Sequence, residues 1–132
     1  MQNKVELGAR ILLGAMMVFF GLNKFTNWVQ PPLSGEALDF MGHLATAGGG
    51  YIMKIVAIVE ILTGLLMLSG FFVPLAAVLL FPIMLNAFLF HLFLDPAGIG
   101  GAAVAMLINI YLFFAHKSAF NAILQAKPST QG

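Results

Sequence analysis

A run of the sequence from residue 61 to residue 94 contains no aspartate, glutamate, lysine or arginine. A helix needs about 20 mostly apolar residues to cross a bilayer, so this run is too long for one crossing. Gly70 and Pro74 lie inside the run. Glycine is typical of the end of a helix, and proline is typical of the start of the next one. The run therefore predicts two membrane-spanning helices joined by a short turn.

Two more long apolar segments lie outside this run, one toward each end of the chain. The sequence is 61% hydrophobic and only 8% charged, whereas soluble domains carry about 25% charged residues. A soluble fold of 132 residues could not bury so much apolar surface, so lipid must be its solvent. We predict a single all-α membrane domain over residues 1–132, a bundle of four transmembrane helices at about 5–27, 51–70, 73–94 and 97–116 with a tail at 117–132.

The basic residues predict how this bundle is oriented. Four lie on one side of it, Lys4, Arg10, Lys117 and Lys127, and two lie on the other, Lys24 and Lys54. Because cytoplasmic loops carry an excess of lysine and arginine, we expect an inner-membrane protein with both termini in the cytoplasm. No small-residue cleavage site follows the first apolar segment, so we interpret it as a retained span rather than a signal peptide.

The segment from 29 to 50 connects the first two spans on the outer side. Pro31 and Pro32 break the chain, Ser34 can cap a helix, and three glycines at 48–50 can end it. Between these limits, apolar and polar residues fall on opposite helical faces. We predict a short extracytoplasmic surface helix, which serves either as a connector or as a lid over an outward-facing pocket.

Composition also limits the chemistry that the chain can perform. The net charge is +1 without a basic tract, so nucleic acid is not an expected partner. The absence of cysteine excludes disulfides, thiol catalysis and iron–sulfur ligation. Because the sequence also lacks a nucleotide or flavin fingerprint and a sufficient set of metal ligands, we expect no intrinsic metal or cofactor.

Polar residues in the predicted spans share helical faces with small residues. In the first, second and fourth spans, residues spaced by three and four form stripes: Arg10, Gly14, Met17, Gly21 and Lys24; Ala57, Glu60, Gly64 and Met67; Gly98, Ala102, Ala105, Asn109, Leu112 and His116. Small residues allow helices to approach closely. We therefore place these stripes inside the bundle and the larger apolar residues toward lipid.

Glu60 lies in the middle of an apolar span and needs a partner. A charged side chain at the centre of a spanning helix costs roughly 2.5–3.5 kcal/mol, so we expect Glu60 to lie inside the bundle. Helical Cβ atoms tilt toward the N-terminus of their helix, which directs Lys24, Glu60 and His91 toward one another in the outer half. We expect Asn86 beneath them, and interpret these four residues as candidates for a ligand or proton site.

Arg10 lies near the inner face, where we expect it to reach lipid headgroups. It is the alternative partner of Glu60 if the predicted boundaries are wrong by one turn. The sequence leaves open whether Glu60 is protonated or is ionised beside Lys24, because burial favours the neutral acid and an ammonium favours the carboxylate. It also leaves open a purely structural ion pair between the first two spans.

Three motifs resemble those of the DoxX family of small membrane proteins. They are "ARILLGAMMVFFGLNKF", "VEILTGLLMLSG" and the Pro74 that follows, and the resemblance covers residues 5–116. It implies a four-helix transmembrane bundle in which the family's Arg, Lys and Glu correspond to Arg10, Lys24 and Glu60. Relatives are associated with sulfur and quinone redox chemistry, as a subunit of thiosulfate:quinone oxidoreductase or in membrane complexes that handle thiol stress. More distant relatives act as chaperones or cargo receptors.

Three functions are consistent with these features of the sequence. The first is an accessory subunit or quinone-interacting component of a membrane oxidoreductase system, with the redox centre held by a partner protein. The second is a small proton-coupled transporter, and the third is a non-catalytic assembly or scaffold protein. No self-sufficient redox or hydrolytic site is visible. His91 and His116 lie at opposite ends of the predicted bundle, which argues against a haem shared between them. Neither the substrate nor the oligomeric state follows from the sequence.

Overall fold

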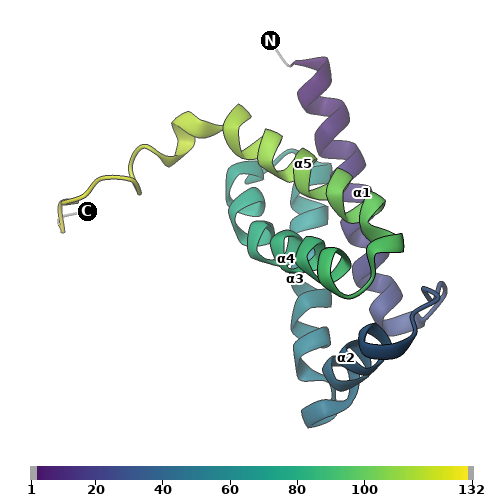
Figure 1. Ribbon diagram of the computed structural model, residues 1–132. Coiled ribbons are helices and arrows are strands. Elements are labelled where there is room, and N and C mark those ends of the chain that lie inside the picture. Colours follow the sequence, from purple (N-terminus) through teal and green to yellow (C-terminus); the bar gives the residue numbers. More distant parts are fainter. Residues whose placement is uncertain (1–2, 131–132) are drawn as a thin grey trace.

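The computed structural model describes residues 3–130, and within that range all regular secondary structure is helical. Four helices are long and apolar enough to cross a membrane. They are α1 (Lys4–Thr26), α3 (Tyr51–Ser69), α4 (Val73–Phe93) and α5 (Ile99–Ala115), the last preceded by the 3₁₀ turn η2 (Pro96–Gly98). These bounds agree closely with the predicted spans and confirm a four-helix membrane bundle (Figure 1).

Shorter elements connect and follow the spans. α2 (Gly35–Thr46) and η1 (Ala47–Gly49) lie between α1 and α3, and η3 (Lys117–Phe120) follows α5. Figure 1 shows α2 beside the end of the bundle where α1 finishes and α3 begins. The predicted helix between the first two spans is therefore present. Ser34 occupies its N-cap position without a side-chain cap hydrogen bond.

The turn between α3 and α4 has the expected residues. Gly70 ends α3 with a φ of 83°, a left-handed conformation that glycine adopts at little cost. Pro74 lies in the first turn of α4. Proline is tolerated there because the N–H groups of the first turn have no acceptor within the helix. α4 then continues through Pro82 as one helix. The charge-free run therefore forms two spans, as predicted.

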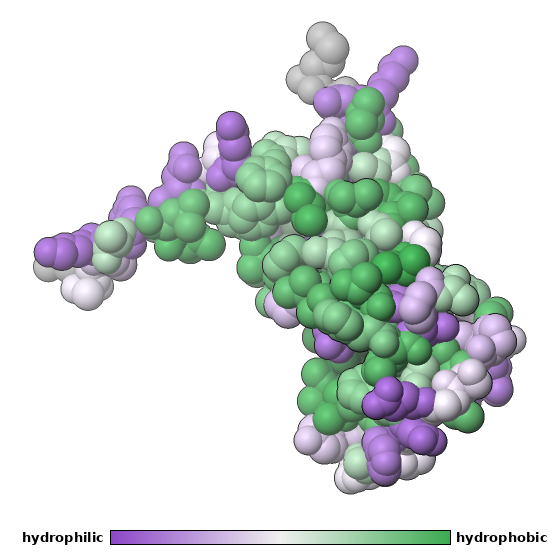
Figure 2. Space-filling model, viewed as in Figure 1, coloured by the Kyte–Doolittle hydropathy of each residue, from purple (hydrophilic) through white to green (hydrophobic). Residues whose placement is uncertain are grey.

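Apolar side chains cover much of the bundle (Figure 2). On α3, Ile55, Ile58, Leu62 and Leu65 are each more than half exposed. A contiguous apolar surface of this extent suits the hydrocarbon of a bilayer rather than water. Figure 2 shows hydrophilic side chains gathered mostly toward the chain ends and around α2. The molecule is therefore a multi-pass membrane protein whose spans contact lipid.

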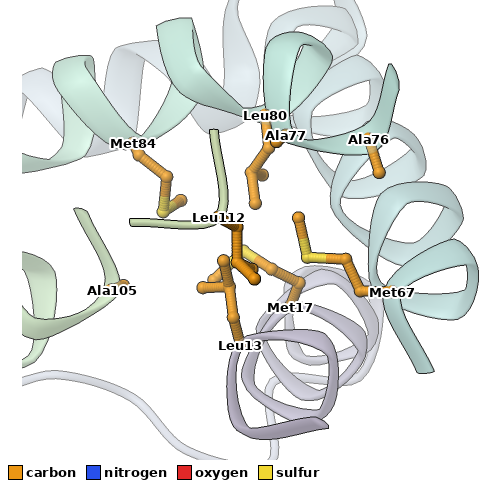
Figure 3. Packing of buried hydrophobic residues seen from close by; sticks show 9 residues of the cluster. All are labelled: Leu13, Met17, Met67, Ala76, Ala77, Leu80, Met84, Ala105 and Leu112. Carbon is orange, nitrogen blue, oxygen red and sulfur yellow. The ribbon is translucent and has the colours of Figure 1, made fainter. Parts of the chain in front are cut away.

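The core is built from all four spans. Figure 3 shows its buried side chains converging between the helices: Leu13, Met17, Met67, Ala76, Ala77, Leu80, Met84, Ala105 and Leu112. Three of these are methionines, whose unbranched side chains fill irregular gaps between helices. The alanines leave room for neighbouring backbones to approach.

Glycines allow α1 and α3 to approach each other most closely. A Cβ added to Gly14 would lie 2.9 Å from the carbonyl oxygen of Gly64, and one added to Gly64 would lie 2.8 Å from that of Gly14. Further along the same contact, a Cβ on Gly21 would lie 2.8 Å from the carbonyl oxygen of Ala57. These distances leave no space for a side chain at the crossing. The predicted glycine stripes therefore form the contact between the two helices.

Candidate functional site

Glu60 faces the inside of the bundle from the middle of α3. Its side chain is only 6% exposed, although the residues around it on α3 are almost all apolar. The other members of its stripe, Ala57, Gly64 and Met67, are also buried. The prediction that Glu60 lies inside the bundle is confirmed.

Lys24, in the last turn of α1, supplies the partner. Its Nζ lies 2.7 Å from Oε2 of Glu60, a distance that combines an ion pair with a hydrogen bond. The ammonium also lies 3.5 Å from the carbonyl oxygen of Phe20. Because the C-terminus of a helix is partially negative, the end of α1 favours a cation at this position. The close approach of α1 to α3 at Gly21, one turn earlier, brings Lys24 within reach of Glu60.

The pair keeps capacity for a further hydrogen bond. An ammonium has three N–H donors, and only one is used on Glu60. Within residues 3–130, the second carboxylate oxygen of Glu60 accepts no hydrogen bond. The Lys24 side chain is 21% exposed, so part of the pair can be reached from outside the bundle. This arrangement can donate to, or exchange a proton with, a small polar group that reaches the exposed part of Lys24.

Asn86 does not join this pair. It is exposed on α4, on the same face as Pro82, and in the described part of the chain it forms no hydrogen bond. The prediction that Asn86 lies inside the bundle beneath Glu60 is therefore wrong. The face of α4 that packs inward carries small and apolar residues instead, among them Ala76, Ala77 and Leu80.

His91 belongs to a second polar group at the turn between α4 and α5. Its Nδ1 lies 2.9 Å from Oδ2 of Asp95, one helical turn further along the chain. A Cβ on Gly98 would lie 2.5 Å from that oxygen and 2.7 Å from Nδ1, so glycine makes room for the contact. In the described residues His91 forms no hydrogen bond or ion pair with Lys24 or Glu60, so the predicted cluster of the three does not form. The spacing of four between His91 and Asp95 was the sequence signal for the pair that does.

Arg10 is buried rather than extended to lipid headgroups. Its side chain is 8% exposed, and Nη1 donates to the main-chain oxygen of Met67 at 2.8 Å. It thereby satisfies a carbonyl at the C-terminal end of α3, where a cation is electrostatically favoured. Nε lies 3.7 Å from Oε1 of Glu6, which in turn lies 3.1 Å from Nε2 of His116. Sequence reasoning missed this contact between the N-terminal end of α1 and the C-terminal ends of α3 and α5.

Asn109 makes the interhelical contact expected of an amide in a bundle. It is fully buried on α5, and Nδ2 donates to the main-chain oxygen of Ala77 on α4 at 3.2 Å. Its Oδ1 is buried without a hydrogen-bond partner. Over residues 3–130, no three His, Asp or Glu side chains gather in a way that could hold a metal ion.

Four apolar helices, with a partly buried lysine–glutamate pair between α1 and α3, define a small integral membrane protein of the helical-bundle class. The sequence model of the DoxX family matches residues 5–92, which include Arg10, Lys24 and Glu60. Because this match covers well over half of the chain, the protein belongs to the DoxX family. No curated protein and no solved structure matches it.

Proposed function

We propose that this DoxX protein is an accessory subunit of an oxidoreductase system in the inner membrane, and that quinone binds at the Lys24–Glu60 pair. The observation that carries the proposal is the 2.7 Å contact between an ammonium and a carboxylate within an apolar bundle. A quinone site needs an apolar slot with a few polar groups that orient the carbonyl oxygens. The association of DoxX relatives with quinone redox chemistry points the same way.

Each residue of the pair has a distinct role in this proposal. The Lys24 ammonium donates a hydrogen bond to a quinone carbonyl oxygen, and its partial exposure gives the ring access. Glu60 holds the ammonium in place and accepts or returns a proton when the ring is oxidised or reduced. The electrons come from a partner protein that carries the redox centre. The chain itself supplies binding and proton transfer.

The contact between Lys24 and Glu60 supports a proton-coupled transporter less well than it supports a quinone site. A transporter that binds a cation at Glu60 must first displace the Lys24 ammonium from the carboxylate. Proton-coupled uptake into proteoliposomes that is lost in Glu60→Gln would favour that alternative. The third candidate, a non-catalytic assembly or scaffold protein, requires only that the Lys24–Glu60 pair joins α1 to α3.

Quinone binding can be measured with the fluorescence of Trp28, the single tryptophan of the chain. Trp28 follows α1 four residues after Lys24, so a quinone bound at the pair should quench its emission. In detergent we expect saturable quenching by a short-chain quinone beyond that of free N-acetyltryptophanamide in the same micelles. Lys24→Met removes the ammonium that donates to the ring and should weaken the apparent affinity by about tenfold, the effect of losing one charge-assisted hydrogen bond.

Lys54→Met is the matched control for this experiment. Lys54 is exposed on α3 near the same end of the bundle and has no salt bridge within the described residues. Its replacement should leave the quenching curve unchanged. Identical curves for wild type and Lys24→Met would contradict quinone binding at the pair, which would then be only a structural link between α1 and α3.

A further inference from the structure

Asn86 places an amide on the outside of a membrane-spanning helix. It lies well inside α4, seven residues before the helix ends at Phe93, and it is exposed. Among residues 3–130 nothing accepts from or donates to its side chain. Hydrocarbon offers no hydrogen bonds, so an amide at this depth is favoured only where another molecule supplies them.

The residues around Asn86 form a regular stripe on α4. Its exposed members are spaced by four and three over the whole helix: Leu75, Leu79, Pro82, Asn86, Leu89 and Phe93. This spacing is that of the a and d positions in the seam between two packed helices. The stripe lies opposite the buried face of α4, which packs on the rest of the bundle through Ala76, Ala77, Leu80 and Met84. The stripe is therefore available to a second helix.

We propose that this stripe is a dimer interface, in which α4 of one chain packs against α4 of a second copy and the two Asn86 side chains hydrogen-bond to each other. An amide has both a donor and an acceptor, so two amides related by a twofold axis satisfy one another. All copies insert into the membrane in the same orientation, so a second α4 presents its Asn86 at the same depth. The stripe carries no charge that would repel its own copy.

An asparagine at one seam position also fixes the register of two helices. In the stripe, Asn86 is the only polar residue, with apolar residues on either side of it. Any sliding of one helix along the other would leave both amides in hydrocarbon. The interface is therefore specific for the arrangement in which the two residues meet.

Disulfide crosslinking tests the dimer directly, because the chain has no cysteine of its own. Leu89→Cys places a single thiol in the stripe, and Leu65→Cys places one on the exposed face of α3, where the side chain is 51% exposed. After oxidation in native membranes we expect a crosslinked homodimer from Leu89→Cys and background crosslinking from Leu65→Cys. Equal crosslinking of the two variants, or a product joining this chain to a different protein, would overturn the proposal.

A second substitution tests the role of the amide. In the Leu89→Cys background, Asn86→Leu should lower the crosslinked fraction about fivefold or more, because the interhelical hydrogen bonds are lost. Asn86→Gln keeps both hydrogen-bonding groups and should restore part of the crosslinking. Because Asn86 is exposed in the monomer, its replacement should leave the thermal unfolding of the monomer unchanged. Undiminished crosslinking in Asn86→Leu would contradict a role for the amide.

Discussion

Replacing Gly64 with alanine should lower the free energy of unfolding by roughly 1–3 kcal/mol, the usual range for overpacking a core. The added Cβ would meet the carbonyl oxygen of Gly14 at 2.8 Å and the main-chain nitrogen of Val18 at 2.9 Å. Both atoms belong to the backbone of α1, so relief requires the two helices to move apart. Thermal or denaturant unfolding in detergent measures the change.

Gly8→Ala is the matched control for this prediction. Gly8 is exposed on α1, and a Cβ there would find no atom within 4 Å. Because alanine is the better helix former by about 1 kcal/mol, Gly8→Ala should be neutral or stabilising. The two substitutions add the same methyl group, and only the close approach of α1 and α3 gives them opposite effects. A Gly64→Ala variant as stable as wild type would contradict that packing.

Lys24→Met should be the most damaging change at the candidate site. It removes the ammonium from Glu60 and leaves a carboxyl group that is 6% exposed without its partner. An unpaired charge at the centre of a spanning helix costs up to about 3 kcal/mol, so we expect a loss of stability approaching that value. Proton uptake by Glu60 would reduce the loss. The measurement is the unfolding free energy in detergent.

Lys54→Met is the control that measures the effect of replacing a lysine that does not contact Glu60. Lys54 is exposed, so its replacement should change stability by less than about 0.5 kcal/mol. Equal effects of Lys24→Met and Lys54→Met would show that the contact with Glu60 contributes nothing to folding.

The sequence was sufficient to predict the spans and the pair because both follow from strong, local physical constraints. The charge-free run is too long for one crossing, and Gly70 and Pro74 mark its division. Helical spacing placed Glu60 on the same face as Gly64, and the structure buries both. The tilt of helical Cβ atoms then distinguished Lys24 from Arg10 as the partner of Glu60.

The face of α4 could not be assigned from its polar residues. α4 is apolar on every side, so placing Asn86 inside depended on the assumption that a polar side chain avoids lipid. The structure instead turns Ala76 and Ala77 inward and Asn86 outward. Small residues were the more reliable guide to the buried face, because close helix packing requires them.

Arg10 was misplaced for a different reason. Its Cβ points toward the end of the bundle where α1 begins, but a long guanidinium can bend back to a nearby acceptor. The carbonyl oxygen of Met67 lies 2.8 Å from Nη1, at the level where α3 ends. A basic residue at the same depth as the C-terminus of a neighbouring antiparallel helix was the sequence signal for this contact.

A double-mutant cycle on Lys24 and Glu60 tests the central claim most directly. The unfolding free energies of wild type, Lys24→Met, Glu60→Gln and the double variant give the energy of coupling between the two side chains. Because their atoms lie 2.7 Å apart, we expect the double variant to lose less than the sum of the single losses, by about 1 kcal/mol or more. Losses that add within about 0.3 kcal/mol would contradict the pair on which the proposed quinone site depends.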